Sequence, residues 1–225
     1  QWIIDQQKNS DLFKISGVHT NGDTTILSDC DNLSLEEIIS DSDIIISLGY
    51  WRIIPESLIS RVPLGIVNVH HSYRLKYKGR HCSTWAIKHG ETVHGSTLHF
   101  IDKRLDEGKI IDTECFPIEP ADTAEDIFFK ANKMGLELLK ANFVPLLLGK
   151  VVCRGSPHKK ALSFREKDLS HAINIENFLY EDYLLREVRS LTFDKKPAPY
   201  IVLGGNKIYL KLEAYDDGYL NKMRK

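Results

Sequence analysis

The chain has 225 residues, of which 42% are hydrophobic and 27% are charged, and its formal net charge is −1 at pH 7. This size predicts one sizeable core with a small appendage, and the charge argues against nucleic acid as a partner. No apolar stretch approaches the roughly 20 residues that cross a bilayer, so no membrane partner is expected. The four cysteines are scattered, which argues against a zinc site and favours reduced thiols in a cytoplasm.

The chain opens in an unusual order for an α/β domain. Residues 1–7 have the pattern of the end of a helix, and residues 12–18 have the pattern of a strand. An α/β domain normally begins with a strand before its first helix. We therefore expect a first strand and its loop to be missing from this chain.

Strands and helices then alternate. Apolar runs bounded by turn residues predict strands over 43–48 and 65–70, and short helices fit at 34–41 and 55–60. Ser34 can cap the first of these helices, which has acidic residues in its first turn. This alternation predicts an α/β fold with a mostly parallel sheet.

The next elements complete a predicted core domain of residues 1–150. A helix is expected over 80–89, and it is followed by strands over 93–101 and 109–118. A long helix is expected over 123–148, because its apolar positions keep a near-helical spacing.

Residues 151–225 are predicted to form a small C-terminal region of one helix and a β-hairpin. The helix is expected over 175–191, and strands over 200–203 and 207–212 flank a glycine turn. A lone hairpin is marginal by itself. We therefore expect this hairpin to pack on the main domain or across a two-fold axis in a homodimer.

The most informative residues are Asn68, His70 and Asp106. Asn68 and His70 are two apart at the end of an apolar strand, so their side chains point to the same side at one edge of the sheet. An amide can bind a developing oxyanion, an imidazole can move a proton near neutral pH, and a carboxylate can orient the imidazole. These groups suit the transfer of a one-carbon acyl unit onto an amine.

The motifs around these residues are similar to those of the folate-dependent formyltransferases. The motifs are, in chain order, Asn68-x-His70, Ser72, Lys78-Gly79, Gly95-Ser96-Thr97-Leu98-His99-Phe100 and Leu105-Asp106-x-Gly108. The resemblance covers residues 43–148, with one departure at Leu75, where the family often has proline. It implies a Rossmann-like formyltransferase domain that uses 10-formyltetrahydrofolate as co-substrate and needs no metal.

The resemblance also implies roles for single residues. Asn68 would donate a hydrogen bond to the formyl oxygen, His70 would assist it and shuttle the amine proton, and Asp106 would hold His70. The residues expected to bind the folate are Trp51, Arg52, Ile53, Ile54, Leu105 and Asp106. The residues considered for binding a diphosphate on the acceptor are Lys78, Arg80, His81, Lys167 and Arg189.

The tail of the chain narrows the expected acceptor. Residues 164–169 and 185–193 resemble the tail of short nucleotide-sugar N-formyltransferases that act on dTDP-4-amino-4,6-dideoxyglucose for surface polysaccharide, such as O-antigen. The resemblance thus implies a nucleotide-linked 4-amino-4,6-dideoxy sugar as acceptor. The alternatives are glycinamide ribonucleotide or methionyl-tRNA as acceptor, a formyltetrahydrofolate deformylase, and a non-catalytic binding module. The low positive charge argues against tRNA.

Some candidates also have plain structural interpretations. His99 lies on an apolar strand and is expected to support the site rather than to react. Arg186 and Arg189 lie three apart on one helix face, where a solvated face or an internal ion pair is as good an interpretation as a phosphate clamp.

Overall fold

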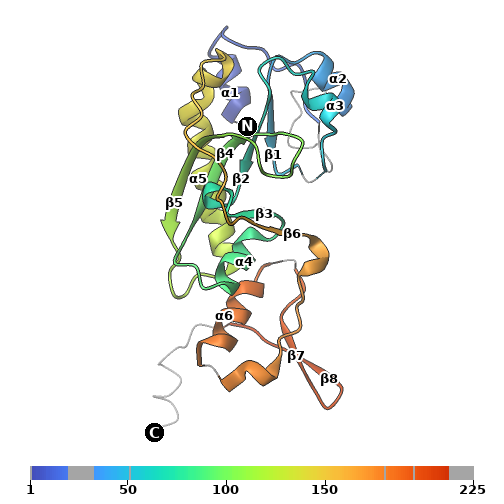
Figure 1. The fold of residues 1–225 in the computed structure, drawn as a ribbon, viewed down its shortest axis with the longest axis vertical. Coiled ribbons are helices and arrows are strands. Elements are labelled where there is room, and N and C mark those ends of the chain that lie inside the picture. Colours follow the sequence, from blue (N-terminus) through green and yellow to red (C-terminus); the bar gives the residue numbers. More distant parts are fainter. Residues whose placement is uncertain (1, 20–32, 51, 180, 195, 213–225) are drawn as a thin grey trace.

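The computed structural model describes residues 2–19, 33–50, 52–179, 181–194 and 196–212. A central sheet carries helices along its faces, and the molecule is elongated, with α2 and α3 at one end and the β7–β8 hairpin at the other (Figure 1). The expected α/β class is confirmed.

The helices of the described residues are α1 (Trp2–Lys8), α2 (Leu35–Ser40), α3 (Glu56–Ile59), α4 (Cys82–Lys88), α5 (Ala124–Leu147) and α6 (Glu181–Leu191), with short 3₁₀ turns η1 (Tyr73–Leu75), η2 (Glu166–Asp168) and η3 (Ile175–Leu179). The strands are β1 (Ile45–Leu48), β2 (Ile66–His70), β3 (Tyr77–Gly79), β4 (Val93–Phe100), β5 (Ile110–Pro117), β6 (Leu162–Phe164), β7 (Tyr200–Leu203) and β8 (Asn206–Tyr209). In the helix expected over 175–191, the first five residues form η3 and only the later part is α-helical.

The main sheet has the strand order β1-β2-β4-β5. β1 and β2 are parallel, whereas β2·β4 and β4·β5 are antiparallel. The expectation of a mostly parallel sheet therefore holds for the β1–β2 pair and not for the two pairings around β4. β4 and β5 are joined by residues 101–109 alone, and a parallel pair needs a longer crossover than this.

The two main helix predictions are confirmed, and each helix begins at a capping box. The Ser34 hydroxyl accepts from the Glu37 N–H at 3.2 Å, and the Glu37 carboxylate accepts from the Ser34 N–H at 2.8 Å. Thr123 and Asp126 make the same reciprocal pair at the start of α5. Both pairs satisfy N–H groups that a helix start leaves without partners.

Helix α5 packs against one face of the sheet, close to the end of β2. Its buried leucines join buried residues of three strands in one core, made of Val67, Leu98, Ile111, Leu138, Leu139 and Leu146. Gly135 lets α5 come close to β2, because a Cβ at this position would lie 2.4 Å from Val69 Cγ1. Packing against α5 thereby holds β2, the strand that carries Asn68 and His70, in place.

The strand predicted over 12–18 is wrong. Residues 11 and 12 form a turn, residues 13–17 have no regular secondary structure, and Val18 makes a single β-bridge rather than a strand. The Ile15 N–H donates to the Gln7 side chain at 2.5 Å. Phe13 packs edge-on against Phe143 of α5, with 5.1 Å between ring centroids. The apolar pattern of this segment therefore reflects packing on a helix.

Strands β3 and β6 form a small parallel sheet that sequence analysis did not predict. Each has only three residues, too few for a periodic pattern to show. Gly79 ends β3 with φ +79°, and a Cβ there would lie 2.2 Å from the Phe164 carbonyl oxygen. The Trp85 and Phe164 rings stack with 3.9 Å between their centroids, which fixes β6 on α4.

The predicted C-terminal hairpin is confirmed, with a second strand shorter than expected. β7 and β8 are joined by Gly204 and Gly205, both with positive φ, as a tight type I′ turn requires. Ile201 anchors the hairpin on a small core with residues from α6, whereas β8 is exposed along its whole length. The homodimer and the domain boundary at residue 150 stay predictions. Among the helices of the described ranges, none has both the length and the apolar character needed to cross a membrane.

Candidate active site

Asn68 and His99 face each other across the β2·β4 ladder, where they are register partners. The Asn68 Nδ2 atom lies 3.3 Å from His99 Nε2, and His99 Nδ1 lies 2.8 Å from the Phe100 carbonyl oxygen. The carbonyl accepts from Nδ1–H, so Nε2 accepts from the Asn68 amide. Burial, together with the nearby charge of His70, lowers the pKa of His99 to about 4, and His99 is therefore neutral.

His70 ends β2 and is held through a single ring nitrogen. Its Nε2 atom lies 2.7 Å from the Tyr77 carbonyl oxygen, 3.6 Å from Asp106 Oδ2 and 3.5 Å from Cys82 Sγ. Burial opposes protonation, but the Asp106 carboxylate, the neighbouring Cys82 and the hydrogen bond to the Tyr77 carbonyl outweigh it and raise the pKa of His70 to about 10. At neutral pH this side chain is an imidazolium.

Asp106 lies in the turn between β4 and β5, with the left-handed backbone angle φ +49°. Its Oδ2 atom accepts a hydrogen bond from the Gly79 N–H at 2.8 Å, and its Oδ1 atom lies 3.9 Å from His99 Nε2. A non-glycine residue in this conformation is held there by its surroundings. The carboxylate is thereby fixed between the two histidines.

The structure thus brings together the three residues that sequence analysis selected for catalysis. It adds three neighbours that received no such role, namely Gly79, Cys82 and His99. The position of His99 opposite Asn68 follows from strand register, which the alternation of apolar residues cannot give. Cys82 carried no sequence signal, because a cysteine at a helix start has no pattern of its own.

The loop after His70 explains the departure from the family at Leu75. Leu75 is fully buried and has φ +54°, whereas the ring of a proline holds φ near −65°. Proline cannot adopt the conformation that this loop has. Ser72 holds the loop instead, because its hydroxyl accepts from the Tyr77 N–H at 2.8 Å and its carbonyl accepts from the Thr97 hydroxyl at 2.7 Å.

The candidates for folate binding lie on two neighbouring loops. The first residue of α3, Glu56, forms an ion pair at 3.7 Å with Lys103 of the loop after β4. Ile54 is buried and anchors the first loop on Ile39 and Ile66. This pairing places the two loops side by side, as a shared pocket requires.

The side chains at the tips of these loops are open to solvent. Ile53 is 80% exposed and Leu105 is 50% exposed, which is unusual for large apolar side chains and leaves apolar surface for a ligand to cover. Arg52 is exposed as well. Trp51 lies outside the described residues.

Three of the basic candidates cluster beside Asp106. Lys78 Nζ lies 2.7 Å from Glu107 Oε1, while Arg80 and His81 both contact the Glu166 carboxylate. Lys167, next to Glu166, is exposed. Lys78 lies in β3, whose Gly79 N–H binds Asp106, and Arg80 and His81 follow that strand directly.

Arg189 is placed differently from the other basic candidates. Its Nε donates to the Asp122 carbonyl at 2.7 Å, and its NH2 group donates to the Glu119 carbonyl at 2.9 Å. These bonds tie α6 to the loop before α5. The geometry favours an internal structural contact over a phosphate clamp, and substrate binding by Arg189 stays a prediction without support from contacts at the Asp106 cluster.

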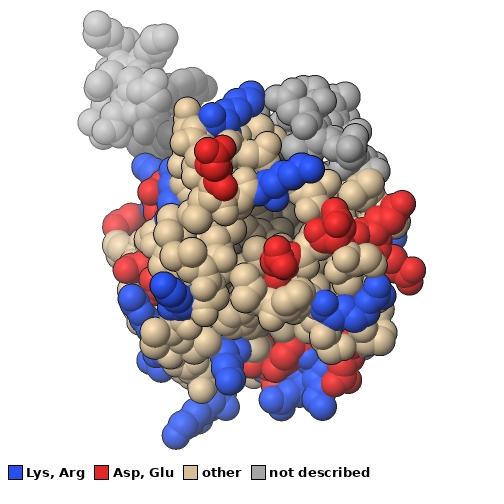
Figure 2. All heavy atoms as spheres, turned by 90° about the horizontal axis from the view of Figure 1, so that it is seen from above, with Lys and Arg blue, Asp and Glu red and all other residues tan. Residues whose placement is uncertain are grey.

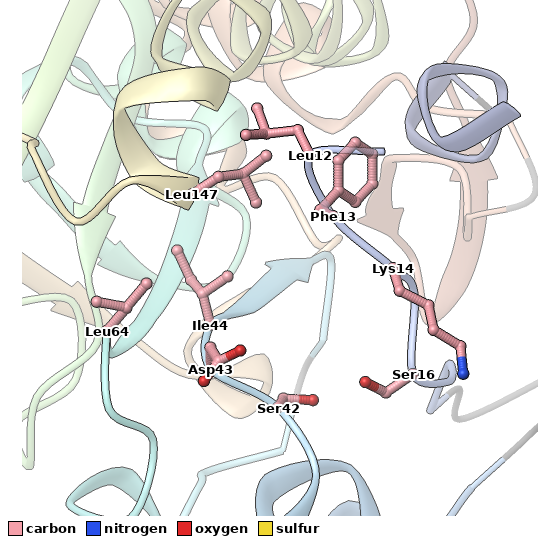
Figure 3. A pocket seen from close by; sticks show the side chains of 9 residues that line it. All are labelled: Leu12, Phe13, Lys14, Ser16, Ser42, Asp43, Ile44, Leu64 and Leu147. Carbon is pink, nitrogen blue, oxygen red and sulfur yellow. The ribbon is translucent and has the colours of Figure 1, made fainter. Parts of the chain in front are cut away.

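Other surface features lie apart from this cluster. Figure 3 shows a pocket of about 140 Å³ between the extended segment 12–16, the start of β1 and the end of α5. Apolar side chains such as Phe13 and Leu147 line one side of it, and it includes none of Asn68, His70 and Asp106. Figure 2 shows acidic and basic side chains interspersed on the end of the molecule seen from above, so the described part of this face has no basic stripe.

Comparison with known proteins identifies the domain. The family described as formyl transferase matches residues 34–141. A methionyl-tRNA formyltransferase of Koribacter versatilis is 44% identical over 97 residues, which are 43% of this chain and 31% of that protein. The chain thus spans about a third of the length of this curated relative.

Solved structures extend the likeness beyond the matched segment. The sugar 3N-formyltransferase WlaRD, solved in the presence of dTDP and 5-N-formyl-THF, is 29% identical, with a TM-score of 0.69 over 81% of this chain and 66% of that chain. An N-formyltransferase of Helicobacter canadensis, in complex with folinic acid and dTDP-3-aminofucose, is 28% identical, with a TM-score of 0.70 over 80% and 65%. The protein Rv3404c of Mycobacterium tuberculosis shares the fold over 96% of this chain and 92% of that chain, with 22% identity and a TM-score of 0.79. Residues 34–141 therefore form a domain of the formyl transferase family, in a fold shared with solved sugar N-formyltransferases.

Proposed function

We propose that this chain transfers the formyl group of 10-formyltetrahydrofolate to the amine of a nucleotide-linked sugar. The observation that carries the proposal is the convergence of Asn68, a protonated His70 and the Asp106 carboxylate at the end of β2. This set offers two hydrogen-bond donors and one base within a single buried cluster. Acyl transfer to an amine needs both functions.

The donors suit the oxygen of the tetrahedral intermediate. The Asn68 amide has two N–H groups, and the contact with His99 uses one of them. Among the described residues, the hydrogen bonds and the ion pair of His70 involve Nε2, so Nδ1 can donate to the reacting oxygen. Donors fixed in advance in a site shielded from water stabilise developing negative charge strongly.

Asp106 is the base that the cluster provides, because His70 is already protonated. The amine lone pair attacks the formyl carbon, and the amine proton passes to the Asp106 carboxylate. The bond between that carbon and the folate nitrogen then breaks, and the Asp106 carboxyl gives the proton that it took from the amine to the leaving nitrogen. His70 stays protonated throughout, and its Nε2 lies 3.6 Å from the Asp106 Oδ2. Protons and bonds balance without a covalent enzyme intermediate.

The exposed apolar side chains of Ile53 and Leu105 suit the flat pterin ring of the folate. Ile54 anchors the loop that carries Arg52 and Ile53, so the pocket wall is preformed on one side. Trp51 belongs to the same proposed pocket but lies outside the described residues.

The acceptor we propose is a nucleotide-linked 4-amino-4,6-dideoxy sugar, with the 3-amino isomer as the closest alternative. The basic side chains of Lys78 and Arg80 beside the cluster suit a diphosphate. WlaRD is a sugar 3N-formyltransferase, and the Helicobacter canadensis enzyme was solved with dTDP-3-aminofucose, so the 3-amino isomer is the first comparison to run. Methionyl-tRNA is the competing acceptor suggested by the Koribacter versatilis relative.

The test is an acceptor panel with 10-formyltetrahydrofolate, read by mass spectrometry. The proposal expects the mass of one formyl group to be added to a dTDP-linked 4-amino or 3-amino sugar. Formate release that does not depend on an acceptor would indicate a deformylase instead. Formylation of methionyl-tRNA but of neither amino sugar would overturn the proposed acceptor.

A further inference from the structure

The carboxylate of Glu166 lies against the side chains of Arg80 and His81, close to the proposed catalytic cluster. The parallel pairing of β3 with β6 brings residues 79–81 beside 164–166, and the Arg80 N–H donates to the Phe164 carbonyl at 3.0 Å. The Glu166 carboxylate, just beyond β6, contacts Arg80 NH1 and lies 3.1 Å from His81 Nε2. One anion from another segment thus faces both side chains.

The surroundings of Glu166 favour negative charge. The hydrogen bond from Arg80 and the contact with His81 hold the pKa of the Glu166 carboxyl below its usual range. The basic side chains of Arg80 and Lys167, which is the next residue after Glu166, make the surroundings of this carboxylate basic.

His81 is held in position by its backbone as well as by its packing. It has φ +58°, a left-handed conformation that is rare outside glycine, and its side chain is only 16% exposed. Strain of this kind is retained at sites where a side chain must point in one direction. The Glu166 side chain, by contrast, is 59% exposed and can rotate away into solvent.

The distance from the catalytic cluster suits a sugar nucleotide. The Gly79 N–H binds the Asp106 carboxylate, and His81 follows two residues later, which places it at most about 7 Å further along the chain. In a nucleotide-linked amino sugar, the diphosphate and the reacting amine sit on opposite sides of one pyranose ring. A ring between the two sites would span this separation.

We propose that Glu166 occupies the diphosphate subsite in the ligand-free chain and that an incoming nucleoside diphosphate displaces it from Arg80 and His81. This inference rests on the proposed nucleotide-linked acceptor. An exposed carboxylate gains little from such a pair, whereas a diphosphate carries more charge and more acceptor oxygens. Glu166 would keep the two basic side chains in place while it competes with the ligand.

The test is calorimetric titration of thymidine diphosphate into the full chain and its variants. Glu166→Gln should bind this probe about 3- to 10-fold more tightly, because the competing charge is gone, and Glu166→Asp should shift affinity in the same direction through its shorter reach. Arg80→Ala should bind at least about tenfold more weakly. Glu36→Gln on α2 makes the same charge change on an exposed helix far from β6, and it should leave the affinity unchanged.

The outcomes separate this inference from the proposed function. Weaker or unchanged binding in both Glu166 variants would make the contact a structural ion pair and overturn the inference. Titration of 5-formyltetrahydrofolate into the same proteins reports on the folate site independently. Folate binding and formyl transfer without a Glu166 effect would leave the function standing and reject the subsite, whereas a Glu166 effect without folate binding would do the reverse.

Discussion

The catalytic cluster and the C-terminal region are built in opposite ways. At the cluster, polar side chains are almost enclosed, and the strands that carry them share a core with α5. In the C-terminal region the core is small, β8 is fully exposed, and the Arg80–Glu166 contact is open to solvent. Under the proposed function, the chemistry would lie on elements held by the large core, and acceptor selection would lie in a region with few buried contacts.

The largest expected effect is a loss of activity in the enclosed catalytic cluster. Asn68→Ala removes one donor to the proposed oxyanion and should lower kcat by about 10²- to 10³-fold. The melting temperature should change far less than the rate. Steady-state kinetics with the accepted sugar nucleotide measure kcat, and Asn9→Ala at an exposed position just after α1 is the matched control. An unchanged kcat for Asn68→Ala would show that the chemistry lies elsewhere.

The stability cost of a large-to-small substitution should differ between the α5 core and the exposed hairpin, because burial differs between them. Leu139 of α5 is fully buried, and Leu139→Ala should cost about 2–5 kcal/mol of the free energy of unfolding. Ile208→Ala on the exposed hairpin should stay within about 0.5 kcal/mol, because Ile208 is 44% exposed. Urea unfolding measures both changes. Similar costs at the two sites would break the comparison.

The cluster should also respond to pH in two directions. The pKa of His70 is raised to about 10, so its contribution to stability is fully present below pH 6.5 and is lost as the pH rises through 10. The pKa values of His71, His94 and His99 are lowered to about 4, so their contribution is present above pH 6.5 and is lost as the pH falls towards 4. The difference in unfolding free energy between the wild type and His70→Gln, measured from pH 6 to pH 10, should shrink with rising pH. A constant difference would contradict the raised pKa.

A smaller effect should appear where the two regions meet. Gly79→Ala places a Cβ against the Phe164 carbonyl at positive φ, and it should cost about 1–3 kcal/mol while loosening the β3–β6 pair. Gly204→Ala shares the positive φ but has open space around it, and it should cost less. Thermal unfolding of both variants isolates the contribution of close approach. Equal costs would mean that only the backbone angle matters.

The smallest expected effect tests whether Arg189 makes a structural contact or binds substrate. Arg189→Ala removes two hydrogen bonds to carbonyl groups and should lower the unfolding free energy by about 1 kcal/mol. The KM for the sugar nucleotide should stay constant, because the guanidinium is already engaged in the contact between α6 and the loop before α5. A rise in KM with unchanged stability would restore Arg189 as a substrate-binding residue.

Sequence patterns predicted the elements whose signals are local. The α2 cap, the long α5 helix and the glycine hairpin follow from residues within one segment. The direction of β4 depends on its partners, and the apolar residues around Phe13 face a helix, so neither could be read from one segment. Three-residue strands such as β3 carry no periodic signal at all.

The site residues also divide into those that local sequence patterns predict and those that depend on contacts between distant segments. Asn68 and His70 share a side of one strand, which follows from the period of two. Asp106 needed the family resemblance, because only the fold brings its turn to Gly79. His99, which sequence analysis assigned to support, contacts both Asn68 and Asp106, and its tautomer depends on the Phe100 carbonyl.

The neutral His99 has a further consequence for Asn68. His99 Nε2 carries a lone pair and accepts a hydrogen bond, so the amide nitrogen of Asn68, and not its oxygen, must face it. The contact thereby fixes the orientation of the Asn68 amide. Asn68→Asp would keep the shape and reverse the polarity, with an acceptor facing both the imidazole lone pair and the substrate oxygen. At this position, a substitution of nearly equal volume should do more harm than truncation.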